Sequence, residues 1–214
     1  MMNKTPRIRV VLADDHAVVR AGFRRLLEST PDIEVVAEAD SGEQAYLTYV
    51  REWPDVLVLD IAMPGIGGLA ALNRIRAHDA NARILVLSVH EDTLFTTRSL
   101  AGGALGYVTK RAVPEVLVEA VRAVAAGRQF LEREIAQSLA LAHTRNEPIQ
   151  TLTGREFDVF RLLASGKTVI EIAALLHIGP KTAGTYQTAI YRKLGVSNAA
   201  QLTRLALNQG IALD

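Results

Sequence analysis

Residues 56–65 read Val-Leu-Val-Leu-Asp-Ile-Ala-Met-Pro-Gly, an apolar run that stops at the acidic Asp60 and passes into a turn of Pro64 and Gly65. A short apolar run bounded by turn-forming residues predicts a buried strand. Four more runs share this character, at Ile8–Leu12, Ile33–Ala37, Ile84–Leu87 and Gly106–Val108. The segments between them carry apolar residues at helical spacing, so residues 1–126 predict an α/β fold with a doubly wound parallel sheet.

The composition excludes several classes of protein. A chain of 214 residues, 49% of them apolar, is long enough for two domains. Its 24 basic and 23 acidic side chains exclude a strongly polybasic protein, and the absence of cysteine excludes disulfide scaffolds and thiolate metal sites. The first residues carry charges rather than the long apolar stretch of a signal peptide or membrane span. We therefore expect a soluble, cytoplasmic protein that is not a membrane protein.

The pattern changes after the last predicted strand. Residues 1–128 are predicted to form the α/β domain, residues 129–150 a partly helical linker, and residues 151–214 an all-α domain of four short helices. We expect those helices at about Thr153–Ser165, Thr168–His177, Lys181–Leu194 and Asn198–Gln209. Residues 151–214 hold seven Lys or Arg and four Asp or Glu, 7 − 4 = +3, a mild basic bias that permits phosphate contacts.

Three carboxylates are predicted to converge at one edge of the sheet. Asp14 and Asp15 follow the first strand, and Asp60 follows the third. The carboxyl ends of the strands are where α/β sheets of this kind bind their ligands. Carboxylates packed together repel one another, and a hard divalent cation such as Mg²⁺ neutralises them. The sequence therefore predicts a Mg²⁺ site at this edge.

Two further strand ends add groups that suit a phosphoryl group. Ser88 follows the fourth strand with a hydroxyl, and Lys110 lies just beyond the fifth with an ammonium. A carboxylate nucleophile, a metal, a hydroxyl and a fixed positive charge are what phosphoryl transfer requires. Each residue alone would more often cap a helix or face solvent, but their joint appearance at different strand ends favours a phosphoryl site.

Four segments resemble the signatures of receiver domains in two-component response regulators. They match in order and spacing at Asp14–His16, Asp60–Gly65, Leu87–His90 and Gly106–Lys110. The resemblance implies a flavodoxin-like receiver with a five-stranded parallel sheet in the order 2-1-3-4-5.

The same resemblance implies a role for each residue of the site. Asp60 would be the phosphoacceptor, Ser88 and Lys110 would contact the phosphoryl group, and Ser88 and Tyr107 would form the switch. The Mg²⁺ cofactor would be held by Asp14, Asp15, Asp60 and the backbone carbonyl of Ala62.

The spacing from Lys110 to Pro114 and the C-terminal segment resemble response regulators of the NarL/LuxR type, whose effector is a LuxR-type helix-turn-helix domain. The matching C-terminal residues are Leu152–Glu156, Gly166-Lys167 and Glu171–Ala173. Thr153 with Glu156 is also a capping-box pattern by itself. The resemblance implies duplex DNA binding by the third helix of this domain, through Lys181, Thr182, Gly184, Thr185, Thr188, Arg192 and Lys193. The pairs Val89-His90 and Lys110-Arg111 are similar to those of regulators of sugar-phosphate uptake in enteric bacteria.

These features favour a phosphorylation-dependent, DNA-binding transcriptional regulator of a two-component system. The expected partners are a sensor histidine kinase, promoter DNA, RNA polymerase and, on phosphorylation, a second copy of the chain. We expect no enzyme activity beyond slow loss of the phosphoryl group from Asp60.

Two other functions are weighed against this one. A receiver-controlled protein-interaction regulator with weak or no DNA binding is the alternative, because Gly184, Val169 and Ile170 depart from the family pattern. Gly184 stands where a long or basic side chain is common, and Val169-Ile170 replaces an Asn-Lys pair. An aspartyl phosphatase is disfavoured, because Ala62 leaves no second acid two residues after Asp60 to donate a proton.

Overall fold

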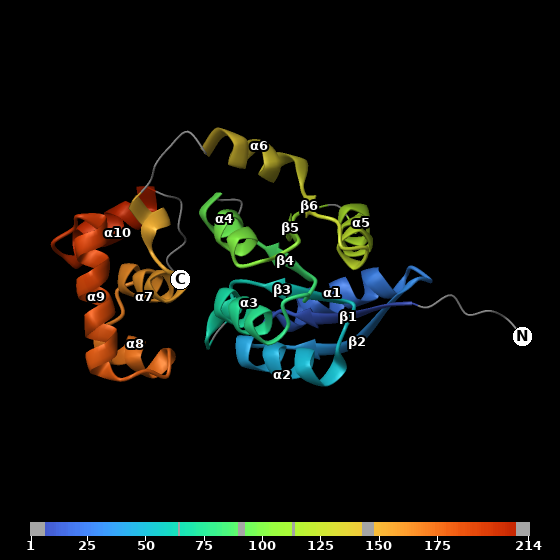
Figure 1. Ribbon diagram of the computed structural model, residues 1–214, viewed down its shortest axis with the longest axis horizontal. Coiled ribbons are helices and arrows are strands. Elements are labelled where there is room, and N and C mark those ends of the chain that lie inside the picture. Colours follow the sequence, from blue (N-terminus) through green and yellow to red (C-terminus); the bar gives the residue numbers. More distant parts are fainter. Residues whose placement is uncertain (1–6, 64, 90–92, 113, 143–147, 209–214) are drawn as a thin grey trace, which may run out of the picture. The chain divides into compact units, whose positions relative to one another are not determined.

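A computed structural model describes residues 7–63, 65–89, 93–112, 114–142 and 148–208 (Figure 1). Two residues of the predicted signatures, Pro64 and His90, lie outside these ranges. The chain divides into two compact units, Met1–Leu139 and Ala140–Asp214. Within the described residues, no helix combines the length and the apolar character needed to cross a membrane.

The N-terminal unit is built on a parallel sheet. Its strands run in the order β2-β1-β3-β4-β5-β6, and every neighbouring pair is parallel. The bounds are β1 Ile8–Ala13, β2 Ile33–Ala39, β3 Val56–Asp60, β4 Ile84–Ser88, β5 Gly106–Thr109 and β6 Phe130–Leu131. The predicted α/β class and the order of the first five strands are confirmed. Each of these five strands runs one or two residues further than its apolar run, which brings the residues of the predicted site to the strand ends.

The sixth strand corrects the five-stranded prediction. Phe130 and Leu131, which fall in the predicted linker, pair with Gly106 and Tyr107 of β5. Two residues are too few to show an alternating pattern in the sequence, so their pairing could not be predicted from periodicity. The open edge of β5 supplies the backbone partners, and these bonds do not depend on side-chain type.

Five helices connect the strands of this unit, namely α1 Ala17–Glu28, α2 Gly42–Glu52, α3 Gly67–His78, α4 Thr93–Ala101 and α5 Pro114–Ala125. Alternate strand residues such as Val10, Val58 and Leu87 pack with Leu27 of α1 and Val121 of α5 in one buried cluster. Burial of apolar side chains on this scale is the main stabilising contribution to such a fold. The sheet therefore holds the ends of β1, β3, β4 and β5 in fixed register.

Close packing at Gly68 fixes the backbone just after β3. A Cβ atom added at Gly68 would lie 2.1 Å from the carbonyl oxygen of Asp60, a distance that no side chain tolerates. The amide of Gly68 also donates to the carbonyl of Ile61 at 3.2 Å. The start of α3 is thus held directly against the residue that ends β3.

The C-terminal part is helical. α6 spans Arg133–Ala142, a 3₁₀ turn spans Pro148–Thr151, and the remaining helices are α7 Gly154–Ala164, α8 Val169–Leu175, α9 Pro180–Leu194 and α10 Ala199–Asn208. The predicted capping box of Thr153 and Glu156 is present at α7, and a second box of Thr168 and Glu171 begins α8. The four predicted helices are confirmed with bounds that differ by at most two residues, and the predicted end of the fourth, Gln209, lies outside the described residues.

The third of these helices, α9, has a buried face and an outward face. Pro180 occupies its first turn, where the missing amide costs nothing, and Gly195 ends it in the left-handed region at φ 65°. Its buried residues are Ala183, Ile190 and Leu194. The other side of α9 is therefore available to a ligand.

Candidate functional site

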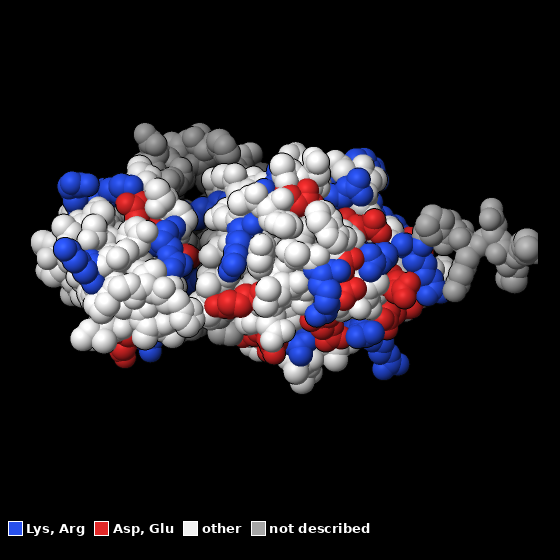
Figure 2. Space-filling view, turned by 60° about the horizontal axis from the view of Figure 1, so that its bottom comes forward, with Lys and Arg blue, Asp and Glu red and all other residues white. Residues whose placement is uncertain are grey.

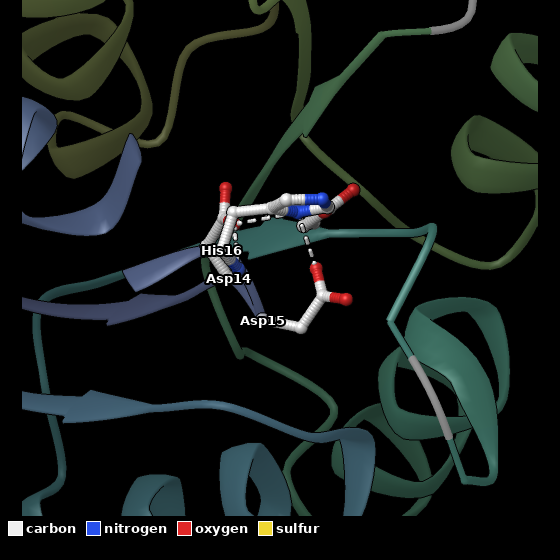
Figure 3. Close-up of side chains that lie close together, drawn as sticks. Asp14, Asp15 and His16 are labelled. Carbon is white, nitrogen blue, oxygen red and sulfur yellow. Dashed lines mark hydrogen bonds and ion pairs between the residues drawn. The ribbon is translucent and has the colours of Figure 1, made fainter. Parts of the chain in front are cut away.

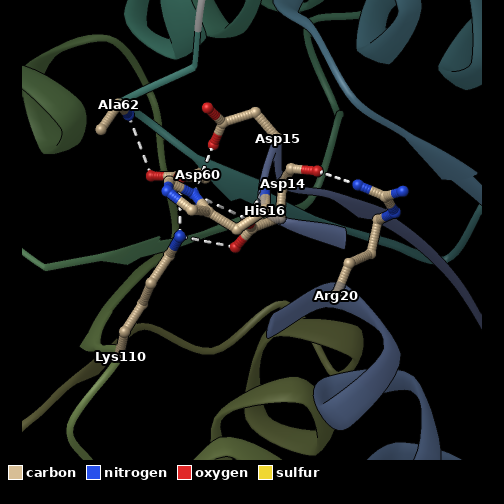
Figure 4. A network of polar contacts seen from close by, with 7 residues as sticks. All are labelled: Asp14, Asp15, His16, Arg20, Asp60, Ala62 and Lys110. Carbon is tan, nitrogen blue, oxygen red and sulfur yellow. Dashed lines mark hydrogen bonds and ion pairs between the residues drawn. The ribbon is translucent and has the colours of Figure 1, made fainter. Parts of the chain in front are cut away.

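Two buried carboxylates meet at one ammonium group. Asp14 follows β1 and Asp60 ends β3, and these two strands are neighbours in the sheet. The Nζ atom of Lys110 lies 2.5 Å from Oδ2 of Asp14 and 2.7 Å from Oδ2 of Asp60 (Figure 4). The side chain of Lys110 is only 9% exposed, and both carboxylates are fully buried or nearly so. The structure thus brings together three residues from three predicted strand ends.

The charges in this cluster are set by burial and by one another. Burial raises the pKa of the Asp60 carboxyl, and it outweighs the hydrogen bonds from Lys110 and from the amide of Ala62, which lower it. Burial alone would lower the pKa of Lys110, but its bonds to Asp14 and Asp60 outweigh burial and leave that pKa above its ordinary value. Lys110 therefore keeps its positive charge at the point where the carboxylates approach.

Backbone contacts hold the remaining predicted residues near the same edge. The amide of Ala62 donates to Oδ1 of Asp60 at 2.9 Å. The amide of Lys110 donates to the carbonyl of Ser88 at 2.8 Å, so the ends of β4 and β5 are tied together. Ser88 and Tyr107 are both completely buried. The predicted switch residues Ser88 and Tyr107 are thus buried, one on each of the neighbouring strands β4 and β5.

A histidine that the sequence did not single out lies beside the acids. His16 Nδ1 is 2.8 Å from Oδ1 of Asp15, and the backbone amide of His16 donates to Oδ1 of Asp14 at 2.8 Å (Figure 3). Arg20 of α1 donates to the backbone carbonyl of Asp14 at 2.5 Å. Only the position of His16 in the first signature could have pointed to it, because its contacts depend on the turn after β1.

The acidic cluster fits a hard divalent cation. Ligand atoms of Asp14, Asp15, His16 and Asp60 all lie within 4.8 Å of one another. Oδ2 of Asp14 and Oδ1 of Asp15 are buried and receive no well-directed hydrogen bond, although each has a cationic or imidazole nitrogen nearby. Carboxylate oxygens are the ligands that Mg²⁺ prefers, and a divalent cation would offset the mutual repulsion of these clustered acids. The donor set therefore suits Mg²⁺.

The outward face of α9 carries the predicted DNA contacts. Lys181, Thr182, Thr185 and Thr188 are exposed and Gly184 is partly exposed. The hydroxyl of Thr185 donates to the carbonyl of Lys181 at 2.9 Å, and that of Thr188 donates to the carbonyl of Gly184 at 3.0 Å. The two threonines thus use their hydroxyl protons within the helix and present methyl groups and acceptor lone pairs outward.

The two cations at the end of α9 differ in their surroundings. Arg192 is exposed, whereas Nζ of Lys193 forms a 2.6 Å ion pair with Oε2 of Glu156 on α7. Burial raises the pKa of Glu156, but the bonds from Lys193 and from Thr153 outweigh it and leave the pKa below its ordinary value. Lys193 therefore joins two helices of the domain in addition to carrying charge.

The surface charge is mixed rather than concentrated. On the face in Figure 2, acidic and basic side chains are interspersed on the N-terminal domain, and basic side chains with a few acidic ones stand within uncharged surface on the C-terminal domain. Among the described residues on this face, neither domain presents a broad area of one sign. Any contact with phosphates would thus depend on a few particular cations, such as those of α9.

Two family models match the chain. Residues 10–122 match the response regulator receiver domain, and residues 150–206 match the luxR family of bacterial regulatory proteins. The chain is 37% identical over 208 residues to the response regulator UvrY of Escherichia coli K12, covering 95% of each chain. It is 37% identical over 209 residues to the response regulator GacA of Pseudomonas aeruginosa, covering 95% of this chain and 97% of GacA.

A solved structure is similar along nearly the whole chain. It is RcsB from Salmonella enterica serovar Typhimurium bound to promoter rprA in the presence of the phosphomimetic BeF3⁻, with a TM-score of 0.72 and 27% identity. The match covers 92% of this chain and 97% of that one. The finer resemblance to regulators of sugar-phosphate uptake stays a prediction.

Proposed function

The chain belongs to the two-component response regulators that join a receiver domain to a LuxR-type regulatory domain, and from this premise we propose that Asp60 is its phosphoacceptor. The protein is a phosphorylation-dependent, DNA-binding transcriptional regulator. One observation carries the assignment of Asp60: its buried carboxylate lies 2.7 Å from the charged Lys110, which also binds Asp14. A carboxylate beside a fixed cation is suited to accept a phosphoryl group.

The proposed reaction needs one bond to form and one to break. An oxygen of the Asp60 carboxylate attacks the phosphorus of a phosphodonor, the bond from phosphorus to the donor's leaving group breaks, and an acyl phosphate results. Lys110 stabilises the negative charge of the transferring group, and the hydroxyl of Ser88 contacts it. Mg²⁺, held by Asp14, Asp15, Asp60 and the backbone carbonyl of Ala62, would neutralise phosphoryl oxygens when bound. Because Ala62 offers no acid, the acyl phosphate is lost only slowly to water.

The phosphoryl group then controls DNA binding. We propose that it changes the contacts of Ser88 and Tyr107, and that residues 129–150 transmit the change as the linker between domains. A homodimer would present two copies of α9 to two half-sites in the major groove, with Lys181, Arg192 and Lys193 on phosphates. The remaining residues proposed to meet the DNA are Thr182, Gly184, Thr185 and Thr188. In the cell the phosphodonor would be a sensor histidine kinase, and the bound dimer would act on RNA polymerase.

One experiment tests both the phosphorylation of Asp60 and its control of DNA binding, by comparing the wild-type chain with Asp60→Asn. Each is incubated with labelled acetyl phosphate and Mg²⁺, and each is used to select genomic fragments with and without acetyl phosphate. We expect label and phosphorylation-enhanced selection only when Asp60 is present. Asp40→Asn is the matched control, because Asp40 is an exposed acid just after β2 at the same edge. Undiminished labelling of Asp60→Asn would refute the assignment.

A further inference from the structure

The segment after α5 binds the edge of β5 through three consecutive residues. Phe130 donates its amide to the carbonyl of Leu105 at 2.9 Å, and Phe130 and Leu131 pair with β5. The amide of Glu132 lies 3.4 Å from the carbonyl of Tyr107. The side chain of Glu132 reaches two residues further along β5, where its Oε2 accepts from the amide of Thr109 at 2.9 Å. The last bond of this series reaches the residue directly before Lys110.

Glu132 also stands at the start of α6. Its backbone carbonyl accepts from the amide of Ala136 at 2.9 Å, which is the first hydrogen bond of that helix. A residue in this position usually directs a side-chain oxygen to the amides of its own helix. Here the carboxylate binds the sheet instead. One residue therefore joins the end of β5 to the beginning of α6.

In the part of the chain that the structure describes, Glu132 is the acceptor of the Thr109 amide and no second acceptor is present. Thr109 is only 6% exposed, and β4 pairs with β5 along the opposite edge, with Ser88 facing Thr109 in register. A buried amide without an acceptor is costly, so Glu132 fixes the orientation of this peptide. The next residue is Lys110, whose ammonium binds Asp14 and Asp60.

We propose that Glu132 is a positioning residue that couples the phosphoryl site to α6. Through Thr109 it holds Lys110 where the phosphoryl group forms, and phosphorylation of Asp60 in return strengthens the attachment of residues 130–132 to β5. The coupling acts in both directions, because two linked equilibria must affect each other equally. This inference rests on the proposed function of Asp60.

The first readout is the rate of phosphorylation of the full-length chain by acetyl phosphate with Mg²⁺. We expect Glu132→Ala to lower the second-order rate constant of phosphorylation by about tenfold, the equivalent of one charge-assisted hydrogen bond. Glu132→Gln keeps a carbonyl oxygen of the same reach and should stay within about threefold of the wild type. Glu132→Asp keeps the charge and can cap α6, but it is one methylene too short for Thr109 and should resemble Glu132→Ala. Glu134→Ala, which removes an exposed acid in the first turn of α6, is the matched control.

The second readout is amide hydrogen exchange of Thr109 and residues 130–142, with and without acetyl phosphate and Mg²⁺. In the wild type and in Glu134→Ala, phosphorylation should slow exchange in this segment. In Glu132→Ala and Glu132→Asp the segment should no longer respond, even when the fraction phosphorylated is matched by longer incubation. If Glu132→Ala failed to fold, the comparison of Glu132→Asp with Glu132→Gln would carry the test.

The outcomes separate this inference from the function on which it rests. If the wild type takes no label at Asp60, the proposed function fails. If Asp60 is labelled normally but the Glu132 variants match Glu134→Ala in rate and in exchange response, the function stands and the coupling through Glu132 is refuted.

Discussion

Replacing Gly184 by alanine should stabilise the C-terminal domain. Gly184 lies in the interior of α9, and its φ is not in the left-handed region. A Cβ atom added there would find Cγ1 of Val169 at 4.0 Å and nothing nearer beyond the backbone of its own helix. Glycine inside a helix costs about 1 kcal/mol relative to alanine, and no contact offsets that cost here. Gly184→Ala should therefore raise the free energy of unfolding by about 1 kcal/mol.

Calorimetry and urea denaturation of the full-length chain would measure this gain. For a domain of this size, about 1 kcal/mol corresponds to a rise in Tm of about 4–8 °C. Gly22→Ala is the matched control in the N-terminal domain, because Gly22 is inside α1 and an added Cβ meets nothing within 4 Å. Gly68→Ala is the opposite control and should destabilise by about 3 kcal/mol, because its Cβ would overlap the carbonyl of Asp60. A loss of stability in Gly184→Ala alongside a gain in Gly22→Ala would refute the reasoning.

Three further predictions concern buried and exposed charges. The hydroxyl of Tyr49 donates to Asp79 at 2.6 Å and helps to hold the pKa of Asp79 below its ordinary 3.8, so Tyr49→Phe should cost about 1.5 kcal/mol at pH 7. The stability that this hydrogen bond contributes is present above the ordinary pKa of Asp79 and is lost as pH falls through its lower pKa in the folded chain. Urea denaturation should therefore show the stabilities of the wild type and Tyr49→Phe converging below about pH 4. Lys110→Met leaves two buried carboxylates without their cation, so the free energy of unfolding without Mg²⁺ should fall by about 3 kcal/mol. The stabilisation by added Mg²⁺ should grow, and an unchanged Mg²⁺ effect would contradict the proposed Mg²⁺ site. Arg192→Met should lower the slope of log K against log salt for DNA binding by about one unit, without loss of stability. Lys193→Met should lower this slope equally and also reduce the free energy of unfolding by about 1 kcal/mol, because its ion pair with Glu156 is lost. Equal stability of the two variants would count against the structural role of Lys193.

Most of the N-terminal fold follows from patterns that the sequence displays. Apolar runs bounded by turns predicted five strands, but the backbone ladder continues past each run because its hydrogen bonds do not depend on side-chain polarity. Asp60, Ser88 and Thr109 therefore end their strands rather than follow them. β6 was missed because the pairing of so short a strand depends on the strand edge beside it, whose residues are 24 positions away in the chain.

The candidate site could likewise be predicted only in part from the sequence. Asp14, Asp60 and Lys110 could be predicted to lie together, because topology alone brings the strand ends to one edge. The contacts of Glu132 could not be predicted, because a glutamate after an irregular segment carries no pattern of its own. In α9 the sequence indicated Thr185 and Thr188 as outward residues. It did not indicate that their hydroxyls would bind carbonyls of their own helix, which depends on rotamer choice.

β6 also protects an edge that would otherwise invite aggregation. A parallel sheet ending at β5 would expose a row of unpaired amides and carbonyls to any other extended chain, whereas a strand of two residues followed by a helix offers very little to pair with. A fragment cut at residue 128 would lose this cover, although it contains every residue proposed to touch the phosphoryl group. Fragments made to isolate the receiver domain should therefore extend through α6, to residue 142, if they are to avoid aggregation through the edge of β5.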